Sequence, residues 1–344
     1  MDDKRKIGFG IIGCGMISKW HAEAITAVDG AYLVGAADAD RAKAASFAAE
    51  YGCTAFPDAD SLIACDRVDA VCICVPSGLH AEYAVRAAAA GKHFVVEKPI
   101  AITREQLRAV IDACEENNVK GCVISQLRFA PSVQRVKKAI DDGILGKILF
   151  ADLTMKYYRT EEYYATSSWR GTKAMDGGGA LMNQGIHGID LVQYLVGPIR
   201  SVSGVCKTLI HDIEVEDTAS LTVEFENGAV GTVAGSTAAF PGFPRYIEIN
   251  GTRGSIALTE DRITLWSVDG EDLTADIGDK SHNVASCNDP TGITFDLHKR
   301  QIADMVIALQ RDSDPLVDIY DGKRAVDVVL SAYEASNEGR KILI

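Results

Sequence analysis

A regular alternation of short apolar segments and helix-length segments over the first 126 residues most constrains the fold. Each apolar segment has the length of a buried strand. Strands that alternate with helices of this length form a parallel, doubly wound α/β sheet. The expected strands are 7–12, 32–37, 70–75, 93–96 and 121–126.

The pattern changes after residue 126, where longer strands with alternating polar and apolar residues appear. This pattern predicts an α+β domain with one large, open-faced, mainly antiparallel sheet, interrupted by a helical segment at about 179–195. We expect two domains, residues 1–126 and 127–344, with the last helix able to pack back on the first domain. The expected later strands are 148–157, 200–209, 216–225, 229–237, 245–250 and 254–258.

The net charge of −13 argues against two classes of partner. An acidic protein is a poor binder of nucleic acid and of anionic membranes, although a local basic pocket could still bind an anionic substrate. No run approaches the ~18 apolar residues of a membrane helix. The nine cysteines include no CxxC pair and no paired metal spacing. We therefore expect no metal site and a reducing, cytoplasmic location.

A glycine-rich turn follows the first strand, in the context that a dinucleotide-binding turn requires. Gly13-x-Gly15-x-x-Ser18 ends the strand and opens a helix. The first glycine permits the tight turn, and the second lets the backbone approach a pyrophosphate. The helix N-terminus then supplies N–H groups and a positive dipole end. Ser18 replaces the usual third glycine and is small enough to keep the helix packed on the strand.

Asp38 makes this common motif more specific. It ends the second strand, roughly 20 residues past the glycines, where an acid accepts hydrogen bonds from the adenosine ribose. An acid here favours NAD because it repels a 2′-phosphate. Arg41 keeps NADP open as the less favoured cofactor. The alternative for Asp38 is an ordinary solvated turn residue.

Lys98 follows the strand 93–96 directly, within the sequence Glu97-Lys98-Pro99. Open parallel sheets bind ligands at the carboxyl ends of their strands. A lysine with a lowered pKa can take a hydroxyl proton during hydride transfer, and burial or a nearby positive charge lowers that pKa. The alternative is a salt bridge with a nearby carboxylate.

A second group of polar residues lies in the glycine-rich stretch 177–190. Asn183, His187 and Asp190 are four and three residues apart, so they share one stripe of a regular helix. A lone histidine is more often a satisfied core or surface residue. The amide and the acid on the same stripe favour a functional site.

Four stretches together resemble the glucose–fructose oxidoreductase/inositol dehydrogenase (Gfo/Idh/MocA) family. The resemblance covers nearly the whole chain. It implies an N-terminal Rossmann domain and a C-terminal domain whose open-faced sheet serves oligomerisation, hence a homodimer or homotetramer. The stretches are GIIGCGMIS, Ala37-Asp38, VPSGLHAEYAVRAAAAGKHFVVEKPI at 75–100 and GGGALMNQGIHGIDL at 177–191.

The resemblance also implies roles for particular residues. Lys98 contacts substrate and nicotinamide, and His187 acts as, or with, the acid/base. The Lys98–Pro99 peptide is often cis in relatives. The cofactor contacts that we expect are Gly13, Gly15, Met16, Ile17, Asp38, Arg41, Pro76, Ser77, His80, Glu97, Lys98 and Gln126.

One position departs from inositol dehydrogenase-like members, which carry aspartate four residues before the histidine. This chain has Asn183, which cannot relay a proton. His187 then needs another orienting group, or Lys98 is the main base. Asparagine here is similar to members that oxidise C3 of a nucleotide-linked sugar acid.

Aromatic and basic residues upstream of Asn183 could stack on a sugar and contact an anion, although core and surface positions of a β-domain are an equal alternative. The substrate contacts that we expect are Lys98, Arg128, Tyr157, Trp169, Arg170, Asn183 and His187.

Three functions compete on this sequence. The first is an NAD(H)-dependent dehydrogenase that oxidises a secondary alcohol of a sugar, cyclitol, glycoside or nucleotide-linked sugar. The second is a redox-neutral enzyme that holds NAD tightly and uses transient oxidation, for example to cleave a glycosidic bond. The third is a non-catalytic, dinucleotide-sensing regulator, which we rank last because Lys98 and His187 are both present.

Overall fold

The computed structural model describes residues 5–277 and 295–344, which form two compact units. The first unit takes in residues up to 126 and the segment 295–323, and the second takes in 127–277 and 324–344. Our domain division assigned 295–323 to the second domain. The segment belongs to the first unit because Gln301 bonds to its backbone, accepting from Ser125 N–H at 3.1 Å and donating to Val123 O at 2.7 Å.

The first unit is built on a six-stranded parallel sheet in the order β3-β2-β1-β4-β5-β6. This confirms the parallel, doubly wound sheet expected from the sequence. All six residues of β1 are buried, which accounts for its continuous apolar run. The strands are β1 (Ile7–Ile12), β2 (Ala31–Ala37), β3 (Thr54–Ala55), β4 (Ala70–Ile73), β5 (His93–Val96) and β6 (Gly121–Val123).

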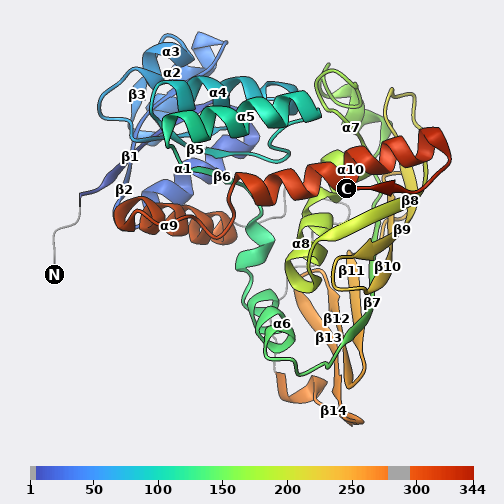
Figure 1. Cartoon of the computed structure of the whole chain (residues 1–344). Helices are drawn as coiled ribbons and strands as arrows, with labels where there is room; N and C mark the ends of the chain where they lie inside the picture. The colour runs from blue at the N-terminus through green and yellow to red at the C-terminus, as the bar shows by residue number, and fades with distance from the viewer. Residues whose placement is uncertain (1–4, 278–294) are drawn as a thin grey trace. The chain divides into compact units, whose positions relative to one another are not determined.

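Helices cover the sheet of the first unit. Apolar residues of α1 and α9 share one buried cluster with β1, β2 and β4. Helices α4 and α5 lie side by side on the other face (Figure 1). The helices are α1 (Met16–Ala27), α2 (Arg41–Tyr51), α3 (Ala59–Ile63), α4 (His80–Ala89), α5 (Arg104–Asn117), α9 (Asp296–Arg311) and the start of α10 (Ile319–Glu338).

The second unit is built on a nine-stranded sheet in the order β14-β13-β12-β11-β7-β10-β9-β8-β15. Only the β7–β10 pair of this order is parallel, which confirms the mainly antiparallel sheet. The strands are β7 (Ile148–Lys156), β8 (Ile199–Lys207), β9 (Thr218–Phe225), β10 (Val230–Ser236), β11 (Tyr246–Gly251), β12 (Gly254–Thr259), β13 (Arg262–Val268), β14 (Glu271–Asp272) and β15 (Ile342–Leu343).

This sheet buries one face and leaves the other open to solvent. In β7, Ala151, Leu153 and Met155 are buried while the residues between them are not. Such alternation is typical of a sheet that packs on a core with one face only. The helices of the second unit are α6 (Pro131–Asp141), α7 (Glu161–Ala165), the π-helix η3 (Ala180–Gly185), α8 (Ile186–Val196) and most of α10.

The sequence analysis missed β3, α3, α7, β13, β14 and β15. Strands of two residues carry too few positions to show a pattern. Strand β13 follows a tight turn in which Glu260, an uncommon residue for this conformation, takes a φ of 54°. By contrast, β9 and β10 correspond to the expected strands 216–225 and 229–237, and they pair antiparallel across Asn227-Gly228.

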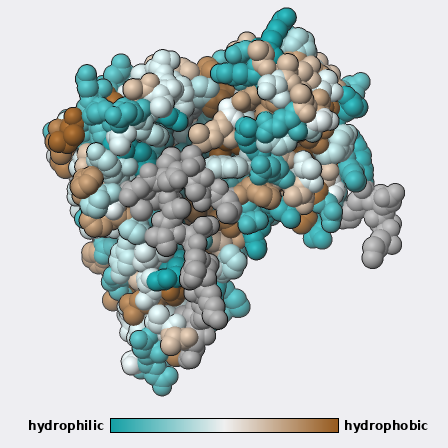
Figure 2. Space-filling model, turned by 180° about the vertical axis from the view of Figure 1, so that it is seen from behind, coloured by the Kyte–Doolittle hydropathy of each residue, from teal (hydrophilic) through white to brown (hydrophobic). Residues whose placement is uncertain are grey.

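Among the helices that the structure describes, none combines the length and the apolar run of a membrane span. On the face shown in Figure 2, hydrophobic residues are interspersed with hydrophilic ones and form no continuous belt.

Candidate active site

The glycine-rich turn between β1 and α1 has the geometry of an anion-binding turn. Gly13 has a φ of 93°, and a β-carbon on it would lie 2.6 Å from the carbonyl oxygen of Cys74. Only glycine fits there. Gly15 is the N-cap of α1, and among the described residues other than its chain neighbours none has an atom within 4 Å of its β-carbon position. The first N–H groups of α1 are therefore open to a ligand on this side.

Ser18 and Asp38 complete this turn. Ser18 is buried, and its hydroxyl donates to Gly15 O at 2.6 Å. Asp38 lies just past β2 and accepts hydrogen bonds from Cys14 N–H at 2.7 Å and Asp40 N–H at 2.8 Å. A carboxylate held at the edge of the glycine turn can accept bonds from ribose hydroxyls.

His80 bridges the segments that follow β4 and β5. Its ring is buried, with Nδ1 2.6 Å from Pro99 O and Nε2 2.8 Å from Val75 O. Burial lowers the pKa of His80, so the neutral ring donates to only one carbonyl at a time. The ring thus holds together two segments at the carboxyl edge of the sheet, and its expected contact with the cofactor stays a prediction.

The Glu97-Lys98-Pro99 segment continues β5, since Glu97 N–H donates to Ile73 O at 3.0 Å. The Lys98–Pro99 peptide is cis, as expected from the resemblance. Glu97 is buried, and one of its carboxylate oxygens lies 2.9 Å from His21 Nε2 and 3.7 Å from His298 Nε2. Burial by itself raises the pKa of Glu97, but the hydrogen bonds and charges of the two histidines outweigh it and hold that pKa well below its ordinary value.

In the second unit, a buried carboxylate holds the start of the glycine-rich helix. Glu216 accepts hydrogen bonds from Gly179 N–H at 3.0 Å, Leu181 N–H at 2.7 Å and the Tyr333 hydroxyl at 3.0 Å. A β-carbon on Gly179 would lie 2.0 Å from Glu216 O, so this close approach requires glycine. The sequence analysis missed Glu216, which has no local motif.

The helix that carries the second group of polar residues begins as π-helix η3 and continues as α8. Asn183 lies in η3 and donates a hydrogen bond to the buried carboxylate of Asp176. Gly171 N–H donates to the other oxygen of Asp176 at 2.9 Å. Asp176 therefore places a carboxylate beside Asn183, the position at which inositol-type members carry an aspartate. No sequence pattern pointed to Asp176.

Asp190 and Arg128 form a buried pair in the second unit. They form a bidentate ion pair at 2.9 and 2.6 Å, and both side chains are at most 5% exposed. The guanidinium also stacks 4.8 Å from the centre of the Tyr194 ring. These contacts engage the guanidinium fork, and the expected contact of Arg128 with substrate stays a prediction. Asn183 lies in the π-helix, whereas His187 and Asp190 lie in α8.

Arginines and aromatic rings surround the amides of η3. Arg159 donates to Gln184 Oε1 at 2.8 Å, and Gln184 donates to the Tyr163 hydroxyl at 2.9 Å and to Asn183 Oδ1 at 2.8 Å. The guanidinium of Arg170 lies 4.4 Å from the centre of the Tyr163 ring. Of these residues, Asn183 and Arg170 are among the substrate contacts expected from the sequence.

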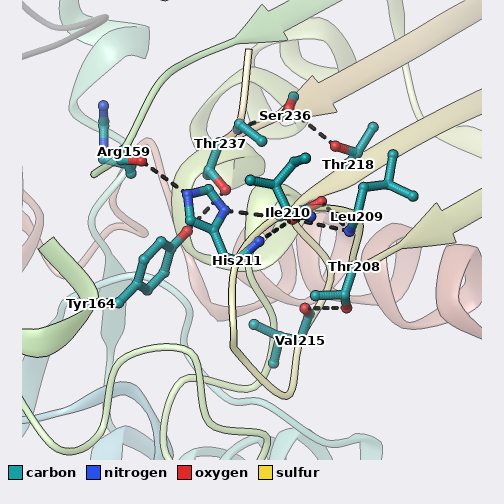
Figure 3. A network of polar contacts seen from close by, with 12 residues as sticks. Arg159, Tyr164, Thr208, Leu209, Ile210, His211, Val215, Thr218, Ser236 and Thr237 are labelled. Carbon is teal, nitrogen blue, oxygen red and sulfur yellow. Dashed lines mark hydrogen bonds and ion pairs between the residues drawn. The ribbon is translucent and has the colours of Figure 1, made fainter. Parts of the chain in front are cut away.

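The backbone of Arg159 is itself fixed by the network in Figure 3. His211 Nε2 lies 3.0 Å from Arg159 O, and Tyr164 donates to Thr237 Oγ1 at 2.9 Å. Asp217 accepts hydrogen bonds from the N–H groups of residues 209–211, which holds the loop that carries His211. Tyr157, expected to contact substrate, is buried, and burial raises its pKa to about 12.

Two family models match this chain. The model described as an oxidoreductase family with an NAD-binding Rossmann fold matches residues 7–125, and the GFO/IDH/MocA C-terminal domain matches residues 133–257. The levoglucosan dehydrogenase of Pseudarthrobacter phenanthrenivorans is 32% identical over 292 residues, which cover 75% of this chain and 75% of that protein. The chain belongs to the GFO/IDH/MocA oxidoreductase family.

Other relatives show the range of this family. The inositol 2-dehydrogenase of Rhizobium meliloti is 32% identical over 264 residues, 74% of this chain and 76% of that protein. The WlbA dehydrogenase of Bordetella pertussis, crystallised with NADH and UDP-GlcNAcA, has a TM-score of 0.87 at 31% identity and covers 99% of both chains. The 2,7-anhydro-N-acetylneuraminate hydratase of Escherichia coli is 30% identical over 258 residues, 73% of this chain and 67% of that protein.

The cofactor of this oxidoreductase family is NAD, and the first unit fits it. Gly13 permits the tight turn, Gly15 leaves room for a pyrophosphate at the start of α1, and Asp38 offers acceptors for the ribose. Met16, at 60% exposure, lies beside this turn. The first unit also holds the remaining expected cofactor contacts, which are Ile17, Arg41, Pro76, Ser77, His80, Glu97, Lys98 and Gln126.

Proposed function

We propose that this protein is an NAD-dependent dehydrogenase that oxidises a secondary alcohol of a sugar, cyclitol, glycoside or nucleotide-linked sugar. One observation carries the proposal. Lys98 lies two residues past the end of β5, in the same parallel sheet whose β1 leads into the dinucleotide-binding turn. Such sheets bind ligands at the carboxyl ends of their strands, so the lysine and the turn share the ligand-binding edge.

In this proposal NAD, when bound, supplies the hydride acceptor, and the residues of the chain handle the proton. Lys98 takes the proton of the substrate hydroxyl, for which its amine has to be neutral. An ordinary lysine has a pKa near 10.4, so the surroundings have to lower it. His187 is the second residue proposed to handle this proton. Asp176 orients Asn183 so that its amide can hold the sugar.

Lys98→Ala tests the proposal, with Lys92→Ala as the matched control. Lys92 precedes the other end of β5 and donates to Cys65 O at 3.1 Å and Val68 O at 2.9 Å. Nicotinamide absorbance is followed with a panel of sugars, inositols and UDP-sugar acids. We expect Lys98→Ala to lose turnover and keep NAD binding, and Lys92→Ala to keep both. Near-wild-type turnover in Lys98→Ala would remove this residue from the mechanism.

Within the substrate class, nucleotide-linked sugar acids are the first to test. The WlbA dehydrogenase, crystallised with UDP-GlcNAcA, covers nearly the whole of this chain. Arg159 and Arg170, close to Asn183 through Gln184 and Tyr163, offer charges for an acidic group.

A redox-neutral reaction is the second candidate, favoured by the relative named a hydratase. Such an enzyme oxidises and reduces its substrate in one cycle and leaves no net reduced cofactor. Nicotinamide that purifies with the protein, together with substrate loss at constant nicotinamide absorbance, would select this candidate over the dehydrogenase.

We further propose that the protein is a homodimer or homotetramer. On neighbouring strands, Phe150 and Val230 are paired in register, and both are exposed. Exposed apolar residues on an open sheet favour a second copy as partner. Light scattering after size exclusion tests this proposal. The eight cysteines in the described residues are all free thiols, which supports a cytoplasmic location, and cell fractionation tests it.

A further inference from the structure

The inference concerns a row of side-chain hydrogen bonds in the second unit that runs from Arg159 to Asp176. Arg159 donates to Gln184 Oε1 at 2.8 Å, and Gln184 Nε2 donates to Asn183 Oδ1 at 2.8 Å. Asn183 Nδ2 then donates to the buried carboxylate of Asp176. We call these four residues the amide relay, because two amides link a guanidinium to a carboxylate.

The guanidinium determines the orientation of both amides. It has donors only, so the amide atom of Gln184 that faces Arg159 is the oxygen. The nitrogen of Gln184 consequently faces Asn183 and the hydroxyl of Tyr163, which accepts at 2.9 Å. Asn183 presents its oxygen to that nitrogen, and its own nitrogen donates to Asp176. The opposite assignment of either amide would place two donors or two acceptors against each other.

Both ends of the amide relay are held by the backbone. The carbonyl oxygen of Arg159 accepts from His211 Nε2 at 3.0 Å (Figure 3), and the guanidinium donates to Tyr158 O at 2.9 Å. At the other end, Gly171 N–H donates to Asp176 Oδ2 at 2.9 Å, so this oxygen is an acceptor. The relay therefore has one direction, from the guanidinium to the carboxylate.

We propose that Gln184 and Arg159 are positioning residues for the Asn183 amide. They hold its oxygen on the side of Gln184 and its nitrogen on the side of Asp176. An amide oxygen accepts from a sugar hydroxyl, whereas an amide nitrogen donates to one, so this orientation decides which contact each side of Asn183 offers. The proposal rests on the proposed function only for the consequence in turnover, because the orientation does not depend on the substrate.

The first test is Gln184→Met, which replaces the amide by an apolar side chain of similar length. The kcat with a substrate from the nicotinamide panel should fall about tenfold or more, because the Asn183 amide can then turn. Gln193→Met is the matched control. Gln193 lies in α8 and accepts from Ile199 N–H at 3.1 Å. Its variant should lose stability and keep kcat.

The second test reverses the direction of the amide relay. Gln184→Glu places an acceptor toward Asn183 as well as toward Arg159, whose charge keeps the introduced carboxylate ionised. Asn183 then faces a carboxylate on each side. In Asp176→Asn/Gln184→Glu, the introduced amide can donate to Asn183 Oδ1, and Asn183 Nδ2 can donate to the introduced carboxylate. The total charge stays that of the wild type.

The double variant separates stability from orientation. Its urea midpoint should lie above that of Gln184→Glu, because each donor of the relay has an acceptor again. Its kcat should stay about tenfold or more below that of Asp176→Asn alone, because the Asn183 amide now has the opposite orientation. Asp176→Asn is the reference, since it already includes any loss of kcat that comes from removing the carboxylate. A purely structural role would change kcat and the midpoint together.

Three outcomes would overturn the proposal. They are wild-type kcat in Gln184→Met, a double variant whose kcat recovers together with its midpoint, and a double variant whose midpoint lies below those of both single variants. If the wild type converts no member of the substrate panel, the proposed function fails. The urea midpoints still decide the orientation of the Asn183 amide in that case, since they need no substrate.

Discussion

The buried Glu216 that holds the start of η3 gives the sharpest test of how the second unit is organised. Its carboxylate accepts two backbone N–H groups and the Tyr333 hydroxyl. Glu216→Ala leaves both N–H groups buried without an acceptor, at about 1–3 kcal/mol each. The free energy of unfolding should therefore fall by about 2–6 kcal/mol, a large part of the usual ~5–15 kcal/mol.

Two milder variants separate the contributions. Tyr333→Phe removes one hydrogen bond, so we expect a loss of about 1 kcal/mol. Glu216→Gln keeps one acceptor oxygen and removes a buried charge, so its loss should be smaller than that of Glu216→Ala. Urea unfolding measures all three variants, with the midpoint and the slope fitted separately.

Enzyme kinetics distinguishes a role of Glu216 in catalysis from a role in stability alone. Since Glu216 sets the helix that carries Asn183 and His187, Glu216→Ala should lower kcat at least tenfold. The KM for NAD should stay within about threefold, because the cofactor turn belongs to the first unit. A Glu216→Ala protein within 1 kcal/mol of wild type, or one whose defect lies in the KM for NAD, would refute the reasoning.

Two further predictions concern carboxylates. One is Asp38 in the cofactor turn, and the other is Asp176 beside Asn183. Asp38→Ala should weaken NAD binding by about 10–100-fold, since it removes a charged acceptor worth about 1.5–3 kcal/mol, and a fluorescence titration measures this. An unchanged affinity would exclude contact with the ribose. Asn183→Asp places a second carboxylate against Asp176, so it should raise a pKa at the site and depress kcat at pH 7. The exchange variant Asp176→Asn/Asn183→Asp should recover much of that kcat, and a double variant no better than Asn183→Asp would contradict the pairing.

The parts of this protein that the sequence revealed are those with a local pattern. Gly13, Gly15 and Asp38 lie at fixed distances from two strand ends, and each strand is a short buried run. Lys98 follows another such run directly. The periodicity of the strands also predicted both sheets, because burial of one or both faces leaves a different pattern of apolar residues.

The supports of the site could not be found in this way, because each joins residues that are distant in the chain. Glu216 meets Gly179 across 37 residues, and His298 reaches Glu97 from α9, near the other end of the chain. Neither Glu216 nor His298 lies in a sequence motif, so only the folded chain shows that they contact Gly179 and Glu97. The same reason explains why the assignment of α9 to the second domain differs from the structure.

The π-helix that carries Asn183 was not predicted, for a local reason. The expected stripe through Asn183, His187 and Asp190 used the 3.6-residue period of an α-helix, whereas Ala180–Gly185 form a π-helix with a wider turn. Glu216 holds the start of this π-helix, and no residue type marks a π-helix in the sequence. Asp190 pairs with Arg128, and Asn183 pairs with Asp176.

Two buried carboxylates, Glu97 of the first unit and Glu216 of the second, should respond to pH in opposite ways. The histidines hold the pKa of Glu97 well below 4.5 in the folded protein, so its contribution to stability is complete above about pH 4.5 and is lost as the pH falls further. Burial raises the pKa of Glu216 above 4.5 despite its hydrogen bonds, so its ionisation opposes folding. The wild-type protein should therefore gain stability relative to Glu216→Gln as the pH falls from 7 toward 4.5. Relative to Glu97→Gln, it should keep a constant advantage over that range and lose it only below. Urea midpoints of the wild type and the two variants between pH 4 and 7 measure both trends. If the midpoints of the two variants had the same pH dependence, the pKa values of Glu97 and Glu216 would not be shifted in opposite directions.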